Sequence, residues 1–216
     1  AELIKGAYNA EYGGRLSAVL NVISREGNKN EFKGKANLSL LSAQTTLEGP
    51  FYKGAWVLSG RRTYFDLVLP KVLPEGVASN IPPYYFYDIQ SHVFSDITPK
   101  DRISLSYYSG IDDIIFDTFG LDGRWGNNTI SGHYRRVFSE RLVGNFLLAN
   151  SRFFTEFGLG GDYGLVSFNE IDDNTISGDF SWFKSSNSTI KFGSQVKWLG
   201  FEYTNKFNED IQFEIK

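Results

Sequence analysis

Apolar and polar residues alternate with a period of two along much of this 216-residue chain. In segment 174–186, Ile176 and Phe180 fall on one side, whereas Ser177 and Asp179 fall on the other. Successive side chains of a β-strand point to opposite faces, so each such segment has one apolar and one polar face. The pattern predicts nine strands, over residues 32–41, 44–51, 55–65, 85–98, 102–116, 127–139, 142–157, 174–186 and 189–207.

The lengths of the strands and of their connections indicate a membrane barrel. Most strands reach the roughly 9–11 residues that a tilted strand needs to cross a bilayer. From residue 52 onward short joints alternate with long connections, which in an up-and-down barrel places the long loops at one rim. The tight joint near Ser42 and Ala43 departs from this alternation. The long connections are 66–84, whose proline-broken apolar run could form a small helix over the barrel mouth, 117–126 and 158–173.

Aromatic residues gather at the ends of the predicted strands. Outer-membrane barrels carry girdles of aromatic side chains at both membrane interfaces, so this placement fits the same fold. The residues concerned are Tyr64, Phe65, Tyr84, Tyr85, Phe86, Tyr87, Phe116, Phe119, Phe153, Phe154, Phe201 and Tyr203.

Composition and charge narrow the class of protein. An aromatic content of 16% together with 22 glycines favours an all-β fold. The net charge is −3 with acids and bases interspersed, which argues against a nucleic-acid partner. Cysteine is absent, so disulfides and thiolate metal sites are excluded. Methionine and an apolar leader are absent too, so we expect an internal fragment or a processed chain.

Two stretches of sequence resemble TonB-dependent receptors, the transporters of bacterial outer membranes. Residues 9–27, NAEYGGRLSAVLNVISREG, are similar to the end of the plug domain in that family. Residues 32–66, FKGKANLSLLSAQTTLEGPFYKGAWVLSGRRTYFD, resemble the first barrel strands, with LEGP and SGRRTY closest to receptors of Bacteroidetes-type bacteria. The later stretches PKDRISLSYYSG and RWGNNTISGHYRRVFS fit the same group.

The resemblance implies an antiparallel, up-and-down transmembrane β-barrel of 22 strands whose lumen holds a plug. On this reading residues 1–30 are the end of the plug, and 31–216 form the first nine or so strands. Such a receptor captures a scarce extracellular solute, and TonB-driven plug movement imports it into the periplasm. The implied partners are outer-membrane lipid, the TonB complex through a missing N-terminal part, and a ligand: siderophore, cobalamin, peptide or glycan.

The sharpest motif lies at the end of the expected plug. Its glycines suit a tight turn. Its two charged side chains, Glu11 and Arg15, are expected to bond to charged residues of the barrel wall. Buried polar contacts of that kind need partners, so the motif is predicted to latch plug to barrel. The latch residues are Glu11, Tyr12, Gly13, Gly14 and Arg15.

Candidate ligand-binding residues lie at strand ends and loops. Arg61 and Arg62 are adjacent on a predicted strand and therefore face opposite ways. One is expected to face the lumen and the other the lipid head groups, although two rim charges without a special role explain them equally well. The remaining candidates are loop aromatics and charges: Tyr64, Asp66, Phe119, Trp125 and Tyr163.

We find no catalytic pattern and predict neither an enzyme nor a bound cofactor or metal. His92 and His133 lie on separate strands without a spaced partner, and a G-x-S-x-G elbow and a phosphate loop are both missing. Clustered carboxylates could hold Ca²⁺, but their spacing does not match an EF-hand, and a solvated acidic rim is expected. These carboxylates are Asp112, Asp113, Asp117, Asp122, Asp172 and Asp173.

Two other architectures remain open from the sequence. A self-contained outer-membrane barrel, of adhesin or structural type, must pair strand 32–41 with its last strand, and an odd strand number argues against that closure. A secreted carbohydrate-binding β-sandwich must pack its apolar faces against each other around a dry interior.

Overall fold

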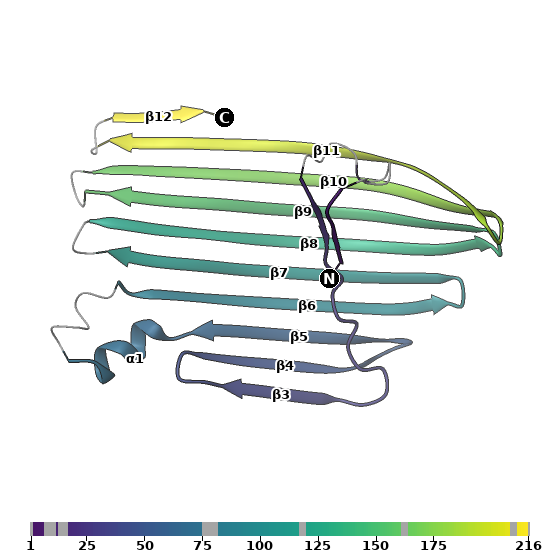
Figure 1. Ribbon diagram of the computed structural model, residues 1–216, viewed down its shortest axis with the longest axis horizontal. Coiled ribbons are helices and arrows are strands. Elements are labelled where there is room, and N and C mark those ends of the chain that lie inside the picture. Colours follow the sequence, from purple (N-terminus) through teal and green to yellow (C-terminus); the bar gives the residue numbers. More distant parts are fainter. Residues whose placement is uncertain are drawn as a thin grey trace.

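Most of the chain forms one antiparallel sheet. The computed structural model describes residues 2–6, 12, 17–74, 82–116, 120–160, 164–207 and 211–215. In this part of the chain, ten strands follow one another in sequence order, each bonded to the next (Figure 1). They are β3 (Lys33–Leu38), β4 (Ser42–Phe51), β5 (Gly54–Thr63), β6 (Tyr84–Thr98), β7 (Asp101–Phe116), β8 (Leu121–Ser139), β9 (Leu142–Leu159), β10 (Leu165–Ser185), β11 (Ser188–Phe207) and β12 (Ile211–Ile215).

The predicted nine strands are all present, as β3 to β11, and the all-β class is confirmed. The sequence did not predict β12, nor the hairpin of β1 (Glu2–Ile4) and β2 (Val19–Asn21), which forms a separate two-stranded sheet. The apolar run after β5 forms helix α1 (Phe65–Val72), as anticipated, and Figure 1 shows it beyond the end of the strand.

The sheet is open. Its two edge strands, β3 and β12, do not pair with each other, and the strands lie in one layer rather than two facing ones (Figure 1). The described residues therefore form neither the closed small barrel nor the two-layered sandwich that remained open from the sequence. An open up-and-down sheet is consistent with part of a larger barrel.

Two predicted long connections are wrong, because the strands beside them run further than expected. β8 begins at Leu121, β9 ends at Leu159 and β10 begins at Leu165. Glycine, asparagine and aspartate in these stretches are typical loop signals, but neighbouring strands on both sides supply hydrogen bonds that keep the backbone extended. The two connections that were predicted too long are 117–126 and 158–173.

The sheet has hardly any core. Among the described residues, only Ala55, Val57 and Phe94 are buried and apolar. The accessible surface is 15036 Å², about half as much again as the roughly 10,000 Å² expected of a compact soluble protein of this length. Strand pairing rather than packing between layers thus holds this structure together.

Register gives the sheet two chemically different faces. Residues directly opposite in a ladder share a face, and pairing places Val93, Leu105 and Leu148 on one side. We call this side the apolar face. The opposite side, which carries His92 and Ser106, is the polar face. We call a row of residues that lie directly opposite one another across successive strands a rung. The central rung of the polar face consists of Glu48, Val57, His92, Ser106, Ser131, Ala149, Thr175 and Lys197.

One segment covers part of the polar face. Figure 1 shows the N-terminal hairpin crossing in front of the strands from β7 towards β10, before the chain descends to β3. We call residues 17–32 the N-terminal segment. Its contacts concentrate on β4, β6 and β7 near the short turns of the sheet.

Candidate functional site

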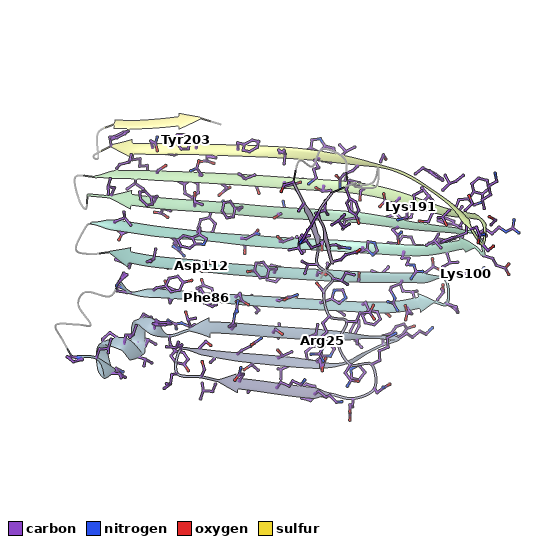
Figure 2. All side chains as sticks on the ribbon, in the orientation of Figure 1. Arg25, Phe86, Lys100, Asp112, Lys191 and Tyr203 are labelled. Carbon is purple, nitrogen blue, oxygen red and sulfur yellow. The ribbon has the colours of Figure 1, made fainter. Side chains whose placement is uncertain are left out.

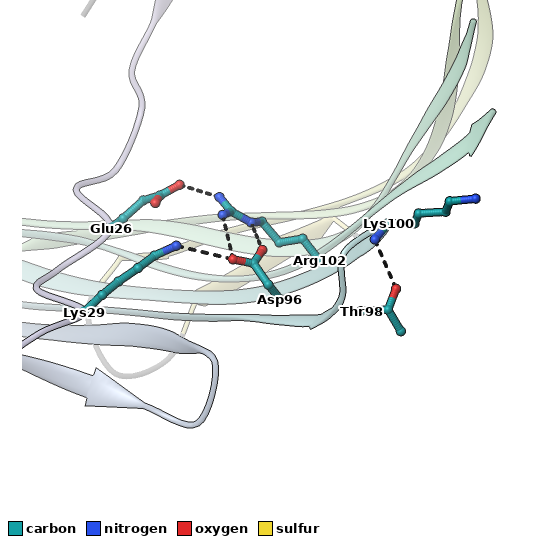
Figure 3. Close-up of polar contacts among 6 residues, drawn as sticks. All are labelled: Glu26, Lys29, Asp96, Thr98, Lys100 and Arg102. Carbon is teal, nitrogen blue, oxygen red and sulfur yellow. Dashed lines mark hydrogen bonds and ion pairs between the residues drawn. The ribbon is translucent and has the colours of Figure 1, made fainter. Parts of the chain in front are cut away.

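A cluster of four charges ties the N-terminal segment to the polar face (Figure 3). Asp96 and Arg102 are directly opposite each other on β6 and β7, and Arg102 Nε lies 2.6 Å from Asp96 Oδ1. Arg102 Nη1 reaches Glu26 Oε1 at 2.7 Å, and Lys29 Nζ reaches Asp96 Oδ2 at 3.3 Å. Charges alternate in sign through this chain of contacts, so every member has an opposite neighbour.

A second ion pair fixes the same segment nearer the sheet edge. Arg25 Nη2 lies 2.6 Å from Glu48 Oε1, and the Glu48 side chain is only 3% exposed. A buried carboxylate needs a compensating charge, and Arg25, whose own side chain is 58% exposed, supplies it to Glu48. Both residues belong to stretches that resemble the receptor family, SREG and LEGP.

The backbone between these ion pairs packs closely on the sheet. Gly27 has φ of +85°, and a Cβ there would lie 2.5 Å from the carbonyl oxygen of Trp56. Phe94 is 2% exposed, with the Lys29 ammonium 4.8 Å and the Arg102 guanidinium carbon 4.5 Å from its ring centre. Cations over an aromatic face are attracted by its quadrupole, so Phe94 joins both sides of the contact.

The neighbouring cations stabilise the ionised form of Asp96. Hydrogen bonds from Arg102 lower the pKa of Asp96 below its ordinary value of 3.8, and Lys29 acts in the same direction. The pKa of Asp101 at the adjoining turn is lowered by hydrogen bonds from Thr98 and Tyr134. Figure 3 shows this turn beside the cluster, with the backbone N–H of Lys100 donating to Thr98 at 3.1 Å.

The structure places the two predicted arginines on opposite faces, as expected. Arg61 lies on the polar face, where its Nη2 is 2.7 Å from Asp88 Oδ2. Arg62 lies on the apolar face and reaches Asp66 Oδ2 at 3.3 Å. Its guanidinium also stands 5.5 Å from the ring centre of Tyr85. Each arginine thus has an acidic partner within the sheet or α1.

The other ligand candidates that the structure describes do not gather into one site. The Tyr64 hydroxyl donates to the Ser39 carbonyl, which holds the β3–β4 joint. Asp66 pairs with Arg62 in the first turn of α1. Trp125 lies on the polar face, directly opposite Asp112 and 38% exposed. Phe119 and Tyr163 lie outside the described residues.

The predicted latch also falls mostly outside the described residues. Of that motif only Tyr12 is described, and its side chain is partly buried; Glu11, Gly13, Gly14 and Arg15 are not. The contacts seen instead come ten or more residues later, through Arg25, Glu26 and Lys29. Sequence reasoning missed these three because charges beside a turn are ordinary surface features. The available signal was Glu48, a glutamate that lies within a predicted strand between Leu47 and Gly49 and so calls for a charged partner.

Comparison with known proteins adds no relative: neither a family model nor a curated protein or solved structure matches this chain. The described residues include no helix both long and apolar enough to cross a membrane. They also bring no three histidine, aspartate or glutamate side chains together in an arrangement that suits a metal ion.

Proposed function

We propose that this chain is part of the wall of a transmembrane β-barrel in the bacterial outer membrane. The observation that carries the proposal is a largely apolar band on one face of a sheet whose described residues form almost no core. On each of β6, β7 and β11 the band is nine residues long, at Tyr85–Val93, Ile103–Ile111 and Ile190–Trp198. A tilted strand needs about 9–11 residues to cross the hydrocarbon layer.

The inclination of the band supports a barrel wall. Its centre on β6 is Ile89, and the rung through Ile89 meets β11 at Gly200. The centre of the band on β11 is Ser194, so the band shifts six residues across five strand spacings. The band therefore moves about 20 Å along the strands while it crosses about 24 Å of sheet. It is inclined by about 40° to the perpendicular of the strands, so strands that cross a membrane along this band would tilt by the same angle. Strands of membrane barrels tilt by about 35–45°.

Charged residues border the band where a membrane would end. Arg124 lies 3.9 Å from Asp113 on one side of it, and Arg136 lies 3.5 Å from Asp101 on the other. Arg152 and Glu170 also pair beyond the band, on β9 and β10. Hydrated ion pairs are favourable at head-group level and unfavourable at the bilayer centre.

The chemistry of the polar face supports a water-filled lumen that holds a plug. Serine, threonine, asparagine and charged side chains dominate its central rungs, and both histidines of the chain lie on it. The N-terminal segment reaches this face through three ion pairs. A plug inside a barrel would lie on the same side.

We further propose that the complete barrel is a TonB-dependent receptor, which captures a scarce solute outside the cell and imports it by plug movement. The support is the sequence resemblance over residues 9–66, two parts of which meet in the ion pair of Arg25 with Glu48. In this proposal the rim with α1 faces outward and the short turns face the periplasm.

Whole-cell cysteine labelling tests the membrane placement. Because the chain has no cysteine of its own, Leu40→Cys and Lys100→Cys each introduce a single thiol. Leu40 is 82% exposed at the α1 rim, and Lys100 lies in the opposite turn. A membrane-impermeant maleimide should label Leu40→Cys in intact cells and Lys100→Cys only after permeabilisation. Equal labelling of both, or recovery of the protein in the soluble fraction, would contradict the proposal.

A further inference from the structure

The polar face carries exposed aromatic side chains that its other features do not explain. We call Tyr108, Trp125, Phe153, Phe157, Phe201 and Tyr203 the aromatic patch. Each lies on the polar face by register, and each is between 38% and 60% exposed. Exposed apolar patches with polar surroundings mark interaction and ligand-binding sites on proteins.

Neither lipid nor the N-terminal segment covers the patch. The apolar band lies on the opposite face, so an interfacial girdle explains Phe154 but not its neighbour Phe153. Figure 2 shows Phe86, Asp112 and Tyr203 near the α1 end of the sheet, well away from Arg25 of the N-terminal segment. By register, Trp125 lies on the rung of these three residues. As far as the described residues go, the patch is therefore open at the rim that faces outward in the proposed function.

The two cations beside the patch already have acidic partners. Arg61 is paired with Asp88, and Lys197 with Asp173, each at 2.7 Å. Asp112 accepts a hydrogen bond from the Tyr84 hydroxyl at 2.9 Å. An anionic ligand would have to break one of the two ion pairs to gain a cation, which makes anionic ligands a poor match.

Hydroxyl and amide groups lie between the rings. The Thr129 and Ser151 hydroxyls are 3.0 Å apart, and Ser151 donates to the Asn127 amide oxygen at 3.3 Å. These groups occupy the rungs of Tyr108 and Phe153 on adjoining strands. These side chains can give up their mutual hydrogen bonds and bond to ligand hydroxyls instead. No polar group would then be buried without a hydrogen-bond partner.

From this combination we infer that the aromatic patch binds neutral carbohydrate chains. A pyranose ring has a face of C–H groups that packs on an aromatic ring, while its hydroxyls bond to amides and hydroxyls at the edge. Several rings spread over β7 to β11 suit several successive sugar units. The inference rests on the proposed function, because it takes this rim to be the entrance and names the ligand class that the receptor captures.

The test is binding of the complete protein, purified in detergent, to an array of neutral oligosaccharides, acidic oligosaccharides and peptides. Neutral glycans should be retained, and titration of the best one should show at least tenfold weaker binding for Trp125→Ala and for Phe201→Ala. Trp198→Ala is the matched control, because Trp198 is 54% exposed, between Trp125 and Phe201, but lies on the apolar face. It should bind as the parent does.

Several outcomes overturn the inference. They are failure to retain any neutral glycan, stronger retention of acidic glycans or peptides, and binding that survives both patch variants. Heat-shifted migration on gels shows separately that each variant remains folded. The labelling of Leu40→Cys and Lys100→Cys distinguishes the two proposals: expected labelling without glycan binding removes only the carbohydrate assignment, whereas the wrong labelling pattern removes the proposed function itself.

Discussion

Arg102 connects the N-terminal segment to β6 and β7 through two acidic partners. It bonds to Glu26 in the segment and to Asp96 in β6, and Asp96 in turn holds Lys29. Loss of its charge therefore affects both anchoring acids at once. Partly exposed ion pairs contribute about 0.2–1 kcal/mol each, so the effect should be measurable without unfolding the sheet.

We expect Arg102→Gln to loosen the N-terminal segment. Amide hydrogen exchange at residues 25–30 should become about two- to fivefold faster, because local opening scales with the lost ion-pair energy. Arg135→Gln is the control, since Arg135 lies directly opposite Arg102 on the same face. Unchanged exchange in Arg102→Gln, or an equal change in both variants, would show that the cluster does not anchor the segment.

Gly27 is the second residue-scale constraint. Its positive φ suits glycine, and a Cβ would meet the backbone of Trp56. We expect Gly27→Ala to lower the free energy of unfolding by at least about 1–3 kcal/mol, the usual cost of a strained backbone position. Urea titration of the folded protein in detergent measures this. Gly132→Ala, where a Cβ has open space, should leave the midpoint within error; equal midpoints for the two variants would refute the constraint.

At the scale of the strand, adjacent residues should differ in their tolerance of charge. Leu148 lies on the apolar face and Ala149 on the polar face of β9. We expect Leu148→Arg to destabilise the protein in lipid bilayers by about 2–4 kcal/mol, the cost of arginine near the bilayer midplane. Ala149→Arg should cost far less, because its side chain meets water. Similar unfolding free energies for the two variants, measured in bilayers, would argue against a lipid-facing band.

Strand identity was largely predictable, and strand length was not. Alternation such as that of Ile176 and Ser177 fixes a strand and its two faces from local sequence alone. The start of β8 at Leu121 was missed because Gly123 and Gly126 are loop signals. Hydrogen bonds from β7 and β9 overrule that local preference, and no property of the glycines themselves reveals those partners.

The candidate site was predicted only in part, for a related reason. Arg61 and Arg62 were expected on opposite faces and lie there, because adjacent strand residues must diverge. Their partners Asp88 and Asp66 depend on register and on the turn into α1. The link from Arg25 to Glu48 was missed altogether, since a contact across 23 residues follows from where the chain crosses the sheet.

At the scale of the whole molecule, the unpaired edges are the dominant feature. β11 pairs with β10 along its length but with β12 only from Tyr203 onward. In an antiparallel strand, alternate N–H groups point to each side, so those before Tyr203 on the outer edge have no strand to bond to in the described structure.

We expect these outward amides to depend on further strands. In a complete barrel the amides of residues 188–202 should all be protected from exchange, whereas in the isolated 216-residue chain, in the same detergent, every second one should exchange rapidly. Mass spectrometry with residue-level fragmentation resolves the two sets. Full protection of the isolated chain would mean that the sheet closes on itself or on a second copy.

The sequence by itself determined that this chain is a series of strands with one apolar and one polar face, because that pattern is set by the alternation of neighbouring residues. Only the tertiary structure decided which residues share a rung, how steeply the apolar band crosses the strands, and where the N-terminal segment rests. Those features depend on hydrogen-bond register between strands, to which each residue contributes only through partners distant in sequence.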